Sequence, residues 1–159
     1  MKLQEKIKNI IPVGYDAKEE LMIFEGGLIL SVLFGSGSFL MKLSNAISRL
    51  YWINGSKRIL KNDAVMPHFT EILGNSLIFF AVLFIICLAF SYVHYYYHTW
   101  GSKSIYTMKR LPQKNEFSKR IFTLPLIMAV TVLALFLVTL GVLFAVYYFR
   151  TPETLIPLF

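Results

Sequence analysis

Two long stretches without a charged side chain constrain the fold of this chain more than any other feature. Ile72 to Ser102 and Ile121 to Phe149 contain no Asp, Glu, Lys or Arg over 31 and 29 residues. About 20 consecutive apolar residues are enough to cross the hydrocarbon core of a bilayer as a helix. Both stretches are therefore predicted to be transmembrane helices.

A third stretch, Leu21 to Met41, is also long enough to cross the bilayer but contains the acid Glu25. The chain of 159 residues is 56% hydrophobic and 16% aromatic, more than a soluble domain of this size could bury in one core. The sequence therefore predicts an all-α integral membrane protein with three transmembrane helices, an N-terminal interfacial helix and a short cytoplasmic coupling helix.

Polar segments flank and separate the three spans, and together they form a single membrane domain. Near the N-terminus four apolar residues share one helical face opposite lysines, which is typical of a helix lying in the membrane plane. A short, fraying, solvated terminus is the alternative. The predicted order is an interfacial helix at 1–12, spans at 17–42, 72–98 and 121–149, an outer connector at 43–71, a cytoplasmic coupling loop at 99–120 and an outer tail at 150–159.

Small residues recur every four positions in the first span, at Gly27, Ser31 and Gly35. Small side chains at this spacing let a second helix approach closely inside lipid, where the hydrophobic effect does not drive helices together. We therefore predict that this face packs against another helix. A break or kink at the neighbouring glycines is the alternative interpretation.

The distribution of basic residues predicts the orientation. In a three-span chain the N-terminal segment and the 99–120 loop share one side of the membrane and carry ten Lys or Arg, against six on the other side. Basic residues accumulate in cytoplasmic segments, so the N-terminus is expected inside. The net charge of +7 suits anionic lipid or an acidic protein partner, whereas its scatter over several segments does not suggest nucleic acid.

The loop between the second and third spans contains a short basic amphipathic segment. Ser102 is a suitable helix N-cap, Ile105 and Met108 lie three residues apart on one face, and Pro112 ends the turn. Such a helix can be an ordinary connector resting on the membrane surface, or it can dock a soluble partner.

From His94 to Arg120 the order of features resembles the first cytoplasmic loop of bacterial ABC-2-type exporter permeases. An aromatic-rich span end is followed by Ser-Lys-Ser, an apolar and aromatic turn, Leu-Pro and a polar stretch before the next span. In that family this loop forms the coupling helix that fits a groove on the ATPase subunit. Family permeases commonly have six spans, so three spans suggest half of a split permease or a small accessory subunit.

The resemblance implies a transport subunit rather than an enzyme, in the bacterial plasma membrane with the N-terminus in the cytoplasm. ATP and magnesium would bind to a separate ABC ATPase subunit, and the other partners would be further transmembrane subunits and the lipid bilayer. The implied ATPase-contact set is Ser102, Lys103, Ser104, Ile105, Tyr106, Met108, Lys109, Arg110, Leu111 and Pro112.

Two further polar features lie near span ends. His94 and His98 are four residues apart on one helical face, a spacing that can hold a metal or flank a haem, but an interfacial anchoring role among the tyrosines is the stronger interpretation. Glu25 is either a functional acid within the membrane or an end-of-helix acid at headgroup depth. The end-of-helix interpretation of Glu25 is favoured.

A second function remains open from the sequence. A small membrane regulator or assembly subunit would bind another membrane protein through Gly27, Ser31 and Gly35 and would have no transport role of its own. A metal or haem protein built on the histidine pair is a third, weaker hypothesis.

Overall fold

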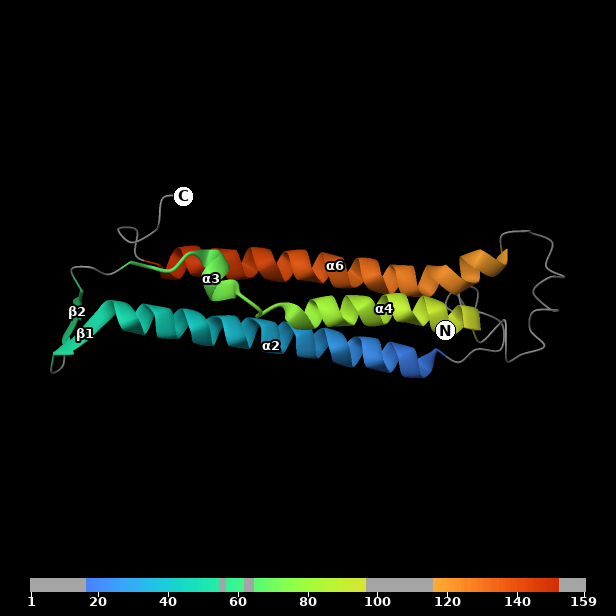
Figure 1. Cartoon of the computed structure of the whole chain (residues 1–159), viewed down its shortest axis with the longest axis horizontal. Helices are drawn as coiled ribbons and strands as arrows, with labels where there is room; N and C mark the ends of the chain where they lie inside the picture. Colours follow the sequence, from blue (N-terminus) through green and yellow to red (C-terminus); the bar gives the residue numbers. More distant parts are fainter. Residues whose placement is uncertain (1–16, 55–56, 62–64, 97–115, 152–159) are drawn as a thin grey trace, which may run out of the picture. The chain divides into compact units, whose positions relative to one another are not determined.

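The structure is a computed structural model of the chain, and it describes residues 17–54, 57–61, 65–96 and 116–151 (Figure 1). In these ranges helices predominate. The elements are α2 (Lys18–Leu50), β1 (Tyr51–Asn54), β2 (Lys57–Leu60), α3 (Phe69–Leu73), α4 (Ile78–Tyr96) and α6 (Glu116–Arg150). The predicted helical class is confirmed at this level. The predicted interfacial helix at 1–12 and the predicted coupling helix lie outside the described residues.

Three of the described helices are long and apolar enough to cross a membrane, namely α2, α4 and the Ile121–Arg150 part of α6. Each keeps large apolar side chains exposed, such as Leu33 at 64%, Ile85 at 64% and Val138 at 62%. Water would not tolerate so much exposed apolar surface on every long helix, whereas lipid does. The structure therefore fits a multi-pass membrane protein.

The first span is longer than the predicted 17–42, because α2 continues to Leu50. Leu43 and Leu50 are both buried, seven residues apart on one helical face. Acids in the first turn and Arg49 in the last turn complement the helix dipole. The predicted outer connector thus begins as helix, since burial of this face continues past Lys42, the first basic residue after the uncharged stretch.

An antiparallel hairpin follows α2 directly and was not part of the all-α prediction. β1 and β2 pair from Tyr51 with Leu60 to Asn54 with Lys57, and the backbone N–H of Lys61 donates to the Leu50 carbonyl oxygen at 3.0 Å. The Asn-Gly dipeptide after Ile53 is a strong hairpin signal. The sequence therefore marked the turn, but the strands are too short to be predicted from alternation.

The second and third spans also differ from their predicted bounds. α4 begins at Ile78 rather than at residue 72, because Gly74 adopts a positive φ of 41° and ends α3. α6 begins at Glu116, inside the predicted 99–120 loop, and continues through Pro125. The 19 residues of α4 correspond to about 28 Å, close to the thickness of the hydrocarbon core.

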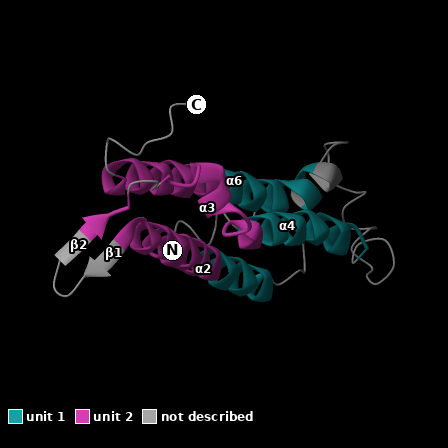
Figure 2. Ribbon diagram, turned by 60° about the vertical axis from the view of Figure 1, so that its left-hand side comes forward, with its two compact units in different colours: residues 1–28, 80–134 teal, residues 29–79, 135–159 magenta. Residues whose placement is uncertain are grey.

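The chain divides into two compact units, coloured in Figure 2. Unit 1 combines residues 1–28 and 80–134, and unit 2 combines residues 29–79 and 135–159. Among the buried side chains of unit 1 are Phe80, Leu83, Cys87, Ile121 and Met128. The polar side chain of His94 is buried in the same unit.

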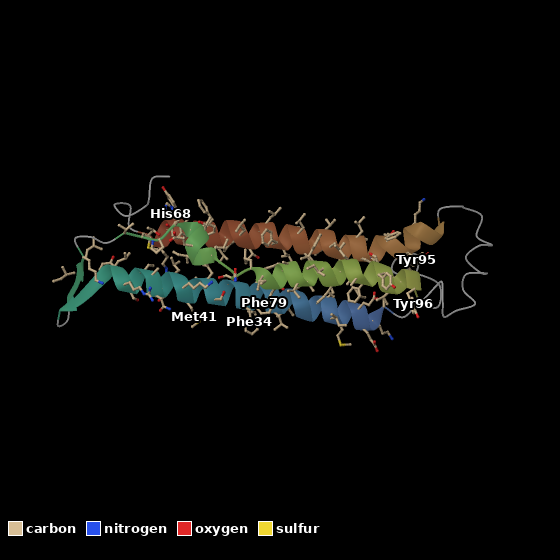
Figure 3. The ribbon with its side chains drawn as sticks, viewed as in Figure 1. Phe34, Met41, His68, Phe79, Tyr95 and Tyr96 are labelled. Atoms are coloured by element: carbon tan, nitrogen blue, oxygen red, sulfur yellow. The ribbon has the colours of Figure 1, made fainter. Side chains whose placement is uncertain are left out.

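Unit 2 is organised around Phe69, on the short helix α3. The centroid of its ring lies 5.7 Å from the ring centroid of Phe39 on α2, and 5.3 Å and 5.7 Å from those of Phe144 and Tyr147 on α6. Phe34 of α2 and Phe79 are a further ring pair in this unit, with centroids 5.5 Å apart (Figure 3). Tilted and edge-to-face pairs of this kind favour specific packing over a loose apolar contact.

Candidate functional site

A buried histidine in unit 1 links three helices. The side chain of His94, in the last turn of α4, has no exposed surface. Its Nε2 lies 2.9 Å from Oε2 of Glu20 on α2, and its Nδ1 lies 3.1 Å from the carbonyl oxygen of Ile121 on α6. Glu20 is itself only 5% exposed. We call these three groups the His94 junction.

Pro125 explains why the Ile121 carbonyl is available. In an α-helix the N–H of residue 125 would donate to the carbonyl of residue 121, but proline has no N–H. The freed carbonyl would be costly to leave unpaired in an apolar environment. The Nδ1–H of His94 supplies the missing donor, so a histidine in α4 pairs the carbonyl that the proline in α6 leaves free.

The contacts of the imidazole show which of its ring nitrogens carries a proton. A carbonyl oxygen can only accept, so Nδ1 must carry a proton. Nε2 then either donates to an ionised Glu20 or accepts a hydrogen bond from protonated Glu20. The pair is neutral overall in both cases, which is the condition under which two titratable groups can be buried at acceptable cost.

The two side chains of this pair lie at helix ends of opposite partial charge. Glu20 lies in the first turn of α2, where the positive end of the dipole stabilises an anion, and His94 lies in the last turn of α4, where the negative end stabilises a cation. The junction can therefore hold one shared proton between two helices.

The structure corrects the anchoring interpretation of His94. An interfacial anchor exposes its polar tip, whereas His94 is fully buried. The neighbouring tyrosines are half exposed or more, Tyr92 at 70% and Tyr95 and Tyr96 at 50%, and Figure 3 labels the last two at the end of α4. The tyrosines thus fit the predicted aromatic anchors and the histidine does not.

The predicted histidine pair cannot be assessed as a metal site in full, because His98 lies outside the described residues. Both ring nitrogens of His94 have protein partners. Within the described ranges, no three His, Cys, Asp or Glu side chains gather in a way that could hold a metal ion.

The buried acid of the first span is Glu20, which the sequence analysis did not single out. The Glu25 side chain is exposed, whereas Glu20 meets His94. One sequence signal pointed to this junction and was missed: a proline within a predicted span leaves the carbonyl four residues earlier without its helical donor. That signal locates the acceptor at Ile121 but does not identify the donor.

The small residues of the first span have packing partners within the chain. A Cβ added to Gly27 would lie 2.6 Å from Cδ1 of Leu83, so the Leu83 side chain of α4 packs directly against the backbone of α2 in unit 1. Ser31 and Gly35, in unit 2, are buried. The face that could have served a separate membrane protein is therefore covered at Gly27 by α4.

The predicted ATPase-contact residues, from Ser102 to Pro112, lie outside the described residues. Comparisons with protein-family models, curated protein sequences and solved structures gave no match.

Proposed function

We propose that this chain is a transmembrane subunit of a bacterial ABC-type exporter, located in the plasma membrane with its N-terminus in the cytoplasm. A separate ATPase chain binds ATP and magnesium and docks on residues 102–112. The subunit performs no catalysis of its own. It passes the movement of the docked ATPase into the spans that enclose the transport path.

The observation that supports this proposal is the position of the His94 junction. His94 lies two residues before the end of α4, and Ile121 lies five residues after the start of α6. The Nδ1 hydrogen bond at 3.1 Å therefore ties together the two helix ends that flank the proposed docking loop. Glu20 adds the start of α2 to the same junction. A push on the loop thus reaches three helices at once.

The alternative, a regulator that binds a membrane partner through its small residues, has less support. Gly27 already meets Leu83 of the same chain. A small-residue face that is occupied internally is not free to recruit another helix.

The test is co-purification with an ATPase subunit from detergent. Ile105→Ala combined with Met108→Ala removes apolar contact worth a few kcal/mol at ~25 cal/mol per Å2, so we expect ATPase association and transport-linked ATP hydrolysis to fall at least tenfold. Lys109→Glu with Arg110→Glu should weaken association mainly at low salt, because rim charges act chiefly on the association rate.

Met22→Ala with Ile23→Ala is the matched control, since both side chains are exposed on α2, at 69% and 52%. This variant loses the same kind of apolar surface outside the loop and should keep its ATPase. Undiminished association of the Ile105/Met108 variant, or the absence of any co-purifying ATPase with the wild-type chain, would refute the proposal.

A further inference from the structure

Unit 2 contains a pocket of about 530 Å3 formed by the last turns of α2, by Lys61, Val65 and Pro67, and by α3. Among the residues that the structure describes, four charged side chains line it: Lys42, Arg49, Lys61 and Glu71. Apolar side chains, among them Leu50 and Ile72, form the rest of its wall. The pocket lies in a different unit from the His94 junction.

The position of the pocket along α2 places it at headgroup depth. Residues 26–41 carry no charged side chain, and Lys42 is the first charge after them. Sixteen helical residues span about 24 Å, most of the ~30 Å hydrocarbon core. Lys42 therefore lies where acyl chains give way to phosphates, and Arg49 lies two turns farther out on the same helical face.

Hydrogen bonds fix two sides of the pocket. The Nζ of Lys42 donates to Oγ of Ser76 at 3.1 Å, which joins α2 to the turn after α3. The N–H of Lys61 donates to the Leu50 carbonyl oxygen at 3.0 Å, which joins the end of the hairpin to the end of α2. The Lys42 side chain and the backbone at Lys61 are thus held in place beside the pocket, which lowers the cost of ordering this part of its wall around a ligand.

The charge and the lining together define the ligand. Three cationic side chains against one carboxylate leave an excess of positive charge, which selects an anion. A free phosphate would use the cations but not the apolar wall, whereas a phospholipid places its phosphate and its first acyl carbons at this depth together. We propose that this pocket binds the phosphate headgroup of an anionic phospholipid. The proposal is independent of the ATPase function.

The experiment uses the full chain in neutral detergent and titrates phosphatidylglycerol, phosphatidylcholine or inorganic phosphate, with bound lipid counted by native mass spectrometry. We expect phosphatidylglycerol to be preferred over phosphatidylcholine at least tenfold, with no competition from millimolar phosphate. Each basic residue near an anionic headgroup contributes about a fivefold factor. Arg49→Gln with Lys61→Gln should therefore reduce affinity for phosphatidylglycerol at least tenfold.

Lys119→Gln with Arg150→Gln is the matched control, because it removes the same charge from exposed positions outside the pocket. It should leave the lipid affinity unchanged. Glu71→Gln removes a carboxylate from the described lining and should raise the affinity several-fold, a gain that misfolding cannot produce. Equal losses in the pocket and control variants, an unchanged Glu71→Gln affinity, no preference between the lipids, or competition by phosphate would each overturn the proposal.

Discussion

At the scale of the residue, the Glu20 carboxylate is the group that pairs with Nε2 of the buried His94. Glu20→Ala leaves the imidazole Nε2 without this carboxylate in an apolar environment, so the free energy of unfolding should fall by about 1–3 kcal/mol. Glu20→Gln should cost less, because an amide can still donate to a neutral imidazole. Thermal unfolding in neutral detergent measures both changes.

Glu25→Ala is the control for this prediction, since it removes the same group from the same helix at an exposed position. Substitutions at such exposed sites usually change stability by less than about 0.5 kcal/mol. If the Glu20 and Glu25 variants unfold at the same temperature, the buried pair does not stabilise the chain.

At the scale of the element, the Pro125 argument can be tested through α6. Pro125→Ala restores an N–H that competes with His94 for the Ile121 carbonyl. The cost of His94→Ala should therefore be smaller in the Pro125→Ala background, by about 0.5–1.5 kcal/mol, the usual net value of one hydrogen bond. A double-mutant cycle on unfolding free energies measures this coupling. A coupling of zero would mean that Pro125 and His94 contribute independently to the free energy of unfolding.

The contact of the Leu83 side chain with the backbone of α2 at Gly27 gives a second prediction at this scale. Gly27→Ala places its Cβ 2.6 Å from Leu83 Cδ1, an overpacking that typically costs about 1–3 kcal/mol. Gly26→Ala has nothing within 4 Å of the new Cβ and should instead stabilise the helix by about 0.5–1 kcal/mol. Denaturant titration of the two variants should show opposite signs.

Leu83→Val should rescue the Gly27→Ala variant, because valine lacks the Cδ atoms that the new methyl group meets. Equal stability of the two alanine variants would mean that Leu83 moves away from the new methyl group at no cost in free energy. The small residue at position 27 would then not be required for packing.

At the scale of the whole molecule, the ten-to-six distribution of basic residues predicts that the N-terminus and the 99–120 loop are cytoplasmic. In a Cys87→Ala background, a cysteine at Ser56 should react with an impermeant thiol reagent in intact cells, and a cysteine at Lys114 should react only after the cells are opened. Labelling of position 114 in intact cells would invert the orientation and remove the proposed loop from the ATPase side.

The proposed transmission through the membrane gives a second prediction at this scale. His94→Ala leaves residues 102–112 intact, so ATPase co-purification should persist. It breaks the contact between the flanking helix ends, so substrate-stimulated ATP hydrolysis should fall several-fold. Met128→Ala, which truncates another buried side chain of unit 1, controls for a general loss of packing.

The sequence by itself determined the number and the approximate bounds of the membrane-spanning helices. Burial in lipid is set by local composition, and a run without charges is visible in one dimension. The Asn-Gly dipeptide after Ile53 is a local signal of the same kind, since turn chemistry depends only on near neighbours.

Only the tertiary structure decided which polar groups meet. Glu20 and His94 are 74 residues apart, and periodicity within either helix does not relate them. Pro125 is a local signal that the Ile121 carbonyl lacks a helical donor, but the donor comes from another helix. The pocket proposed to bind lipid likewise combines Lys42 of α2 with Lys61, which follows β2. Pairing of this kind depends on how helices pack, and the sequence pattern of one helix does not show which other helix lies beside it.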